Sequence, residues 1–210
     1  MKAITYYLSP QSPWTYLGHD RLMAMAKTHG ATIEPRPCAL NSAIFPVSGG
    51  LPLKQRSVQR QAYRLVELQR WSEHLGIPLN IHPKFFPVDE SVAAMMIAAT
   101  VKSVGNDAAL TLTGALLRAV WSEERDISNA DTLIQIANEN GLDGKALYAA
   151  HAQAKELFDE YTREAIERQV FGAPWYEYQG VPYWGQDRLE FLERALTLPE
   201  RNPASGQHNA

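Results

Sequence analysis

Cysteine is nearly absent from this sequence of 210 residues, since Cys38 is the only one. A single cysteine cannot form a disulfide within the chain, and there is no Cys-x-x-Cys pair to carry disulfide exchange. The sequence therefore excludes a disulfide oxidoreductase. Cys38 follows a predicted strand and a proline, and no histidine is close to it in sequence. We expect a small packing residue there, with a catalytic thiol as the alternative.

Excess charge and long apolar runs are also lacking. The formal net charge is −3 at pH 7, and the basic residues form no dominant stripe. This gives no electrostatic reason to expect nucleic acid or an acidic membrane as a partner. The longest apolar-rich run, 92–101, is too short to span a bilayer, and the N-terminus lacks the pattern of a secretory signal. We therefore expect a soluble, cytoplasmic protein. The six histidines show no metal-ligand spacing, so no metal is expected.

Apolar residues make up 45% of the chain, enough for a sizeable core, and the first segments have clear patterns. Residues 3–8 predict a buried strand. Pro13 suits the first position of a helix over 13–29, and a second strand is expected over 32–37. A strand, a helix and a strand in so short a stretch indicate a βαβ unit with a parallel pair and a right-handed crossover.

The middle of the chain is helical by pattern. It follows a loop over 41–54 that is rich in Gly, Pro and Ser, and Ser128 or Asn129 is expected to cap one of its helices. Strands return on either side of the turn Gln179-Gly180, which is typical of a hairpin. The expected helices cover 56–75, 91–103, 108–121, 131–140, 146–168 and 187–196, and the returning strands cover 175–178 and 181–184.

The order of elements is β-α-β, then helices, then β-β-α. This is the order of a thioredoxin-like α/β domain that carries a large all-α insertion. We expect residues 1–50 and 166–200 to form the discontinuous thioredoxin-like domain and 51–165 to form the insertion. The polar segment 201–210 is expected to be a flexible tail.

Three separated stretches carry a family resemblance. They are "SPWTYLG" after the first strand, "YRLVELQRWSEHLGIP" with "VWSEERDIS" in the helical part, and "FGAPWYEYQGVPYWGQDRLEFLERAL" near the end. In order and spacing the chain resembles the 2-hydroxychromene-2-carboxylate isomerase family, in the DsbA-like branch of the thioredoxin superfamily, with the kappa-class glutathione transferases as relatives. The resemblance implies reduced glutathione as cofactor, a small aromatic substrate and a homodimer.

The corner between the first strand and helix is where this superfamily carries its redox cysteines, and here it has Ser12 and Thr15. A serine hydroxyl with no evident base is a poor nucleophile. A hydroxyl donor at a helix N-terminus would, however, stabilise the thiolate of bound glutathione. The resemblance makes Ser12 the catalytic residue and gives Thr15 a place in cofactor binding. Ser9 fits a second register, but only the Ser12 register aligns Trp14 with the family's aromatic position. The alternative for Ser12 is a plain helix cap.

The resemblance assigns four further cofactor-binding positions near the end of the chain. It implies a cis bond between Ala173 and Pro174, with both backbone groups of Ala173 presented to the cysteinyl part of glutathione. Gln186 and Asp187 fall where relatives bind the γ-glutamyl group. The alternative for Asp187 is a helix cap.

Arg60 falls where relatives carry lysine, and it could pair with the glycine carboxylate of glutathione. The alternative is a solvated basic face, since Arg56, Arg60 and Arg64 recur at a spacing of four.

Together, the residues and the resemblance predict a glutathione-dependent cis-trans isomerase that acts on 2-hydroxychromene-2-carboxylate or a similar intermediate of aromatic degradation. Two alternatives remain open. A kappa-like glutathione transferase or peroxidase would use the same site, and a non-catalytic thioredoxin-fold protein would dock a peptide on the edge at Ala173-Pro174. Trp14, at the corner, is a candidate wall for an aromatic substrate.

Overall fold

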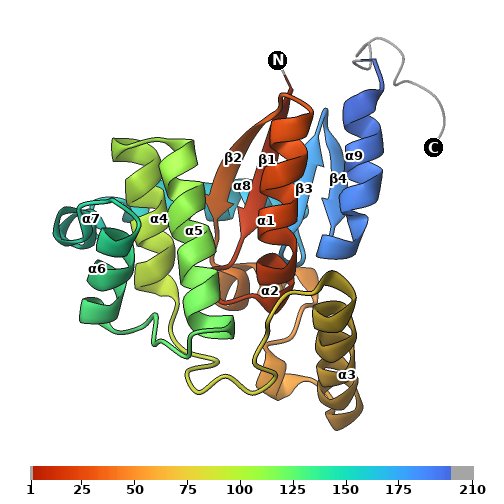
Figure 1. The fold of residues 1–210 in the computed structure, drawn as a ribbon, viewed down its shortest axis with the longest axis horizontal. Coiled ribbons are helices and arrows are strands. Elements are labelled where there is room, and N and C mark those ends of the chain that lie inside the picture. The colour runs from red at the N-terminus through yellow and green to blue at the C-terminus, as the bar shows by residue number, and fades with distance from the viewer. Residues whose placement is uncertain (1, 200–210) are drawn as a thin grey trace.

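The computed structural model describes residues 2–199 and shows a four-stranded sheet with helices around it (Figure 1). The segment 201–210, expected to be a polar tail, lies outside the described residues. The chain has the predicted thioredoxin-like α/β fold, with an all-α insertion between its second and third strands. Among the described residues, no helix combines the length and the apolar character that crossing a membrane requires.

The sheet has the order β2-β1-β3-β4. β1 (Ala3–Leu8) pairs with β2 (Thr32–Pro37) in parallel, which confirms the predicted βαβ unit. β3 (Trp175–Tyr178) pairs antiparallel with β1 on its other side, and β4 (Val181–Trp184) pairs antiparallel with β3 as the predicted hairpin. All four strands have the predicted bounds.

Helix α1 (Pro13–Thr28) connects β1 to β2 and begins at the corner where the catalytic serine was expected. Ser12 caps it and Pro13 occupies its first turn, where the missing N–H of proline costs nothing. The chain turns into β2 at Gly30, whose φ of +61° suits glycine. Figure 1 shows α1 across one face of the sheet with α9 (Leu189–Thr197) beside it, and α8 (Lys155–Glu167) on the other face.

The helical part differs from the prediction in two places. The expected helix over 146–168 is two helices, α7 (Gly144–Ala150) and α8 (Lys155–Glu167). α7 packs against α6 (Ala130–Glu139), and α8 packs against β2, so one straight helix could not make both contacts. The expected loop over 41–54 contains a π-helical turn (Leu40–Ile44) and the short α2 (Phe45–Ser48), because Ile44 and Phe45 are buried there.

The other expected helices are present, with ends that shift by a few residues. A 3-10 turn precedes α3, and another precedes α9. Helices α4 to α7 gather beyond β2, and α3 stands apart below the sheet, near the start of α1 (Figure 1). The bounds are α3 (Val58–Leu75), α4 (Ser91–Ser103), α5 (Asn106–Trp121), α6 (Ala130–Glu139) and α9 (Leu189–Thr197), with 3-10 turns at Leu53–Gln55 and Gln186–Arg188.

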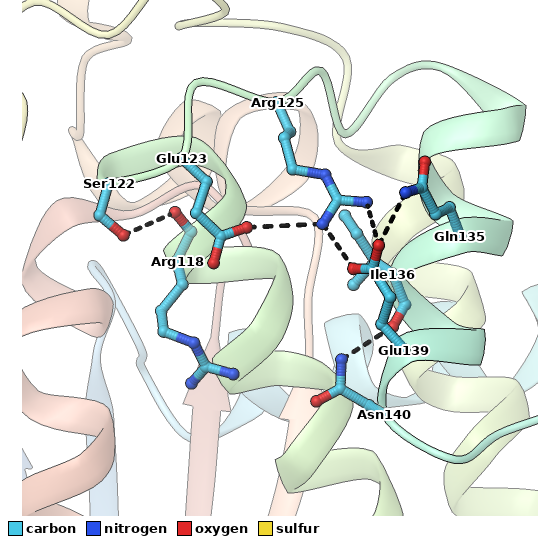
Figure 2. A network of polar contacts seen from close by, with 8 residues as sticks. All are labelled: Arg118, Ser122, Glu123, Arg125, Gln135, Ile136, Glu139 and Asn140. Carbon is cyan, nitrogen blue, oxygen red and sulfur yellow. Dashed lines mark hydrogen bonds and ion pairs between the residues drawn. The ribbon is translucent and has the colours of Figure 1, made fainter.

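A polar network fixes the loop that leaves α5 and enters α6 (Figure 2). Arg125 lies 2.7 Å from Glu139 and 3.5 Å from Glu123, and its backbone N–H donates to Ala119 at 2.8 Å. Asn129, one of the two predicted caps, accepts from the N–H of Thr132 at 3.0 Å. Exposed ion pairs contribute about 0–1 kcal/mol each, so the caps and backbone bonds matter more here. The network holds the loop next to Trp121, the last residue of α5.

Candidate functional site

A cavity of about 1200 Å³ opens beside the first turn of α1. Its walls come from the corner before α1, the segment after α2, the inner side of α3, the segment before α4 and the turn after β4. The sequence-predicted residues that line it are Ser12, Arg60, Ala173, Gln186 and Asp187. Thr15 and Pro174 are not among its lining residues; both are buried beside residues that are.

Ser12 is buried, at 8% exposure, and its hydroxyl has two backbone partners. Its Oγ accepts from the N–H of Thr15 at 3.2 Å and donates to the carbonyl of Ala173 at 3.3 Å. The first bond makes Ser12 the N-cap of α1, which was the alternative role predicted for it. The second is long, and it points the hydroxyl hydrogen across the corner. A hydroxyl that accepts from an amide is polarised into a better donor, so the cap and a catalytic role are compatible.

The first turn of α1 also leaves one backbone donor free. Pro13 has no N–H, and the N–H groups of Ser12, Thr15 and Tyr16 have acceptors at 3.0 to 3.2 Å. Within residues 2–199, the N–H of Trp14 has no acceptor. An unpaired N–H at a helix N-terminus carries partial positive charge, and it favours an anion. Trp14 itself lines the cavity, as expected for a candidate wall.

The Ala173-Pro174 peptide is cis, as the resemblance implied. Ala173 differs from the expectation in one respect, because its carbonyl is not free. It accepts from the Ser12 hydroxyl, so the two predicted residues are in direct contact. Thr15 is fully buried, and in the described part of the chain its hydroxyl has no hydrogen-bond partner.

Gln186 is almost fully buried, and its orientation is set by Arg21 of α1. The Arg21 guanidinium donates to the side-chain oxygen of Gln186 at 2.6 Å and to its backbone oxygen at 3.2 Å. Arginine can only donate, so the amide oxygen of Gln186 is taken. Its NH₂ group is therefore the part left for a ligand, and it would select an acceptor such as a carboxylate.

Asp187 is exposed and pairs with Arg188 at 2.7 Å. The alternative that it caps the last helix is wrong, since α9 begins only after Arg188 and has no side-chain cap. Asp187 is the middle residue of a 3-10 turn (Gln186–Arg188), and its carboxylate pairs with Arg188 instead of a helix N–H. The carboxylate is thus available to a ligand cation, at the cost of a surface pair worth about 0–1 kcal/mol.

Arg60 lines the cavity and is exposed, which fits both a ligand-binding residue and the solvated face that was the alternative. Arg56 and Arg64, one turn before and after it, also line the cavity and are partly buried. Burial and the charge of Arg56 lower the pKa of Arg64 to about 10. Glu67 lines the cavity too and pairs with Arg70 at 2.8 Å. The spacing of four indicated these three arginines, but the sequence could not show that Arg56 and Arg64 are partly buried.

Ser9, the serine of the second register, is engaged elsewhere. Its hydroxyl donates to Glu90 at 2.6 Å, and the N–H of Gln11 donates to the same carboxylate oxygen at 3.1 Å. Burial raises the pKa of Glu90, and these two bonds offset part of that effect. Ser9 therefore anchors the corner to the segment before α4. Nothing in the sequence linked Ser9 to Glu90, because 81 residues separate them.

Two other chemistries find no support in the geometry. Cys38 is buried, at 2% exposure, and burial raises the pKa of its thiol to about 12. It is a packing residue, as predicted. Within residues 2–199, no three His, Cys, Asp or Glu side chains are grouped so that they could hold a metal ion.

Comparison with known proteins gives consistent results. The model of the DSBA-like thioredoxin domain family matches residues 3–197. A 2-hydroxychromene-2-carboxylate isomerase of Pseudomonas putida is 30% identical over 197 residues, 92% of this chain and 93% of that protein. A solved 2-hydroxychromene-2-carboxylate isomerase is 28% identical with a TM-score of 0.79, over 92% of this chain and 94% of that one. Cytosolic disulfide reductase DsbM of Pseudomonas aeruginosa, solved with GSH, has a TM-score of 0.67 at 16% identity, over 93% and 100% of the two chains, and shares the fold alone.

Proposed function

Since the chain belongs to the 2-hydroxychromene-2-carboxylate isomerase family, within the DSBA-like thioredoxin domain family, we propose that it is a glutathione-dependent cis-trans isomerase. Its substrate in this proposal is 2-hydroxychromene-2-carboxylate or a similar intermediate of aromatic degradation. The proposal includes a cytoplasmic location, where thiols stay reduced, and a homodimer; the homodimer rests on the family resemblance alone.

One observation carries the proposal, and it is the Ser12 hydroxyl at the start of a 16-residue helix, on the wall of the cavity. Beside it, the N–H of Trp14 is a second donor. A charge-assisted hydrogen bond and a helix terminus together contribute about 2–3 kcal/mol to an anion placed there. Each pKa unit corresponds to about 1.4 kcal/mol. This corner would therefore lower the pKa of a bound thiol by roughly two units.

The bond from Ser12 to Ala173 suggests how the site responds to a ligand. An extended peptide that docks beside Ala173 would donate an N–H to the Ala173 carbonyl. This donor would replace the Ser12 hydroxyl, whose present bond of 3.3 Å is a weak one. The hydroxyl would then be free to turn toward sulfur. In this account, peptide docking and thiolate stabilisation occur together.

The remaining predicted residues fit the ends of glutathione. The free NH₂ of Gln186 suits the γ-glutamyl carboxylate, and Asp187 suits the ammonium group. Arg60, exposed at the cavity wall, suits the glycine carboxylate. Thr15, buried beneath the corner, supports Ser12 through its N–H. Pro174 keeps Ala173 in place.

Bound glutathione would supply a thiolate that adds reversibly to the conjugated carbon of the substrate, so that the former double bond can rotate before the thiolate leaves. No electron is gained or lost overall, and glutathione is not consumed. The chain's part is to keep the thiol ionised through Ser12, to hold both partners in one cavity and to exclude water. Trp14 would form the wall against an aromatic ring.

The test is the thiolate absorbance of bound glutathione near 240 nm, titrated against pH for the wild type, Ser12→Ala and Ser9→Ala. We expect the wild type to ionise the thiol about two units below its free pKa. Ser12→Ala should lose at least about one unit of that shift, since each unit corresponds to about 1.4 kcal/mol. Ser9→Ala is the matched control, because it removes a hydroxyl at the same corner that is bonded to Glu90.

Equal shifts in Ser12→Ala and in the wild type would contradict the role of Ser12. A wild type that does not bind glutathione would contradict the whole proposal and would favour a peptide-binding protein. Consumption of glutathione in the presence of an electrophile, with no isomerase activity, would indicate the transferase alternative.

A further inference from the structure

Arg64 on α3 has a charged group that the described structure leaves without a counter-ion. Within residues 2–199, its guanidinium makes no hydrogen bond and no ion pair, and its Nη2 atom is buried. The residue lines the same cavity as Ser12. Burying an unpaired charge is unfavourable, and such charges in proteins are normally paired. An unpaired guanidinium on a cavity wall is therefore placed to meet an anion from a ligand.

Two aromatic rings hold this guanidinium in place. It lies 5.3 Å from the ring centre of Phe86 and 5.7 Å from that of Trp121. The two rings also contact each other, with centres 4.7 Å apart. Cation–π contacts compensate part of the cost of burial and restrict how the group can turn. They leave its N–H groups unsatisfied, so the donors remain available for two parallel bonds to a carboxylate.

Hydrogen bonds connect the residues around Arg64 to the corner that contains Ser12. The indole N–H of Trp121 donates to the carbonyl of Gln11 at 3.1 Å. Gln11 directly precedes Ser12, and its side-chain amide makes two bonds with the backbone of Val88, at 3.0 and 3.1 Å. The segment that contains Phe86 is thus fixed to the corner. A ligand held at Arg64 would have a defined position relative to Ser12.

The local charge favours an anion further. Arg56, just before α3, and Arg60, on α3, line the cavity with Arg64, and Glu67, the nearest acid along the helix, is paired with Arg70. The lowered pKa of Arg64, about 10, still leaves it protonated at neutral pH. Aromatic side chains from Trp14, Trp71 and Phe86 line the cavity, so the ligand that fits has a flat ring as well as a carboxylate.

We propose that Arg64 binds the carboxylate of an aromatic or conjugated acid in this cavity and thereby determines substrate specificity. The inference rests on the proposed function, since it assigns the second ligand of the same site. The division of roles follows from exposure. Arg60, which is exposed, takes the glycine carboxylate of glutathione, and Arg64, which is less exposed and lies against two aromatic rings, takes the carboxylate of the substrate.

The test compares binding of trans-cinnamate and trans-cinnamamide to the protein saturated with glutathione, by isothermal titration calorimetry. The two probes differ in charge and share their shape. We expect the wild type to prefer cinnamate by about tenfold or more, and Arg64→Gln to reduce the preference to about threefold or less. Arg64→Lys, which keeps the charge without the planar fork, should retain part of the preference.

Arg60→Gln is the matched control on the preceding turn. It should weaken glutathione binding and leave the preference for cinnamate intact, whereas Arg64→Gln should leave glutathione binding within about twofold of the wild type. The melting temperature of Arg64→Gln should change little, since the loss of the two cation–π contacts is offset by the removal of a buried charge without a counter-ion. A fall in melting temperature together with an unchanged preference would identify a structural residue and overturn the proposal.

A wild type without a preference for cinnamate would also overturn the assignment of Arg64. Failure of glutathione to bind the wild type is a different result, which would contradict the proposed function. The cinnamate comparison would then be made on the protein alone, where the same preference and its loss in Arg64→Gln would still decide the role of Arg64.

Discussion

Cys38 shows how burial alone can remove a group from the chemistry of a site. Its thiol is surrounded by apolar residues at the end of β2, and its Sγ is 3.7 Å from the carbonyl of Leu8. Burial disfavours the thiolate, and the pKa rises to about 12. The thiolate is the reactive form of cysteine. The chain therefore has no nucleophilic sulfur of its own, and any thiolate in the cavity would come from a ligand.

We expect Cys38 in the folded protein to react with Ellman's reagent at least about a thousandfold more slowly than a free thiol at pH 8, because both the thiolate fraction and access are reduced. Full labelling should follow when the protein is unfolded in guanidinium chloride. The measurement is the rate of absorbance change in both states. Rapid labelling of the folded protein would show an exposed, reactive thiol and would reopen a catalytic role for Cys38.

Ser9 and Ser12 show how neighbouring side chains of one type acquire different roles. Both are buried serines that precede a proline. The hydroxyl of Ser9 has a short bond to a carboxylate, and that of Ser12 has a long bond to a carbonyl. A carboxylate is the stronger acceptor, so a ligand can displace the second bond more easily. The sequence favoured Ser12 over Ser9 as the active serine because only the Ser12 register aligns Trp14 with the family's aromatic position. The hydrogen-bond partners of the two hydroxyls now give a physical reason for the same choice.

The contact between α1 and the turn Gln186–Arg188 links the fold to the site. Gly18 lies on the face of α1 that meets this turn. A Cβ at position 18 would be 2.8 Å from the hydroxyl of Tyr176 and 2.9 Å from the Cβ of Gln186. Both neighbours are buried, so neither can move away freely. The absence of a side chain at Gly18 is thus what allows Gln186 to approach the start of α1.

If Gln186 binds glutathione as proposed, Gly18→Ala should move Gln186 and weaken glutathione binding by roughly tenfold, equivalent to about 1.4 kcal/mol. The clash should also destabilise the protein by about 1–3 kcal/mol, less the gain of about 1 kcal/mol in helix propensity. Glutathione affinity is measured by calorimetry and stability by urea unfolding.

Gly141→Ala is the control for destabilisation without displacement of the site. Gly141 follows α6 with a φ of +76°, and no atom lies within 4 Å of a Cβ placed there. The strained backbone should cost about 1–2 kcal/mol and leave glutathione affinity unchanged. If both variants weaken glutathione binding equally, a specific role for the contact at Gly18 is refuted.

The strands and α1 could be read from the sequence because local signals determine them. Alternation, a proline at the first helical position and a hairpin turn act within a few residues. The break between α7 and α8 could not be read in this way, since both halves are helical by pattern. It is set by packing against two different partners, α6 and β2. The same limit applies to Arg64, because the rings that cover it come from distant segments.

His19 joins the sheet, α1 and the helical insertion in one buried contact. Its ring is 3% exposed. Its Nε2 is 3.0 Å from the carbonyl of Leu110 in α5, and its Nδ1 is 3.3 Å from the hydroxyl of Tyr6 in β1. A carbonyl can only accept, so Nε2 carries the proton and Nδ1 accepts from Tyr6. This arrangement is satisfied by the neutral ring. A second proton on Nδ1 would face the hydroxyl of Tyr6 and would bury a charge.

The stability of the whole protein should consequently depend on the protonation of His19. Burial lowers the pKa of His19 to about 4 in the folded state, against about 6.5 when unfolded. Between these values the unfolded chain binds more protons, so stability is fully present above pH 6.5 and falls as the pH drops toward 4. The wild type should lose about 2 kcal/mol of unfolding free energy between pH 7.5 and pH 5 from this group.

The measurement is urea unfolding at both pH values for the wild type and His19→Gln, whose amide can still donate to Leu110 but does not titrate. Glu90, whose pKa burial raises, contributes with the opposite sign in this range, since its folded form takes up the proton first. That contribution is common to both proteins and cancels in their difference. His19→Gln is expected to be less stable at pH 7.5 and to lose about 2 kcal/mol less on acidification. Equal losses would mean that a charged His19 is accommodated in the fold, and that the link between sheet and insertion does not depend on a neutral ring.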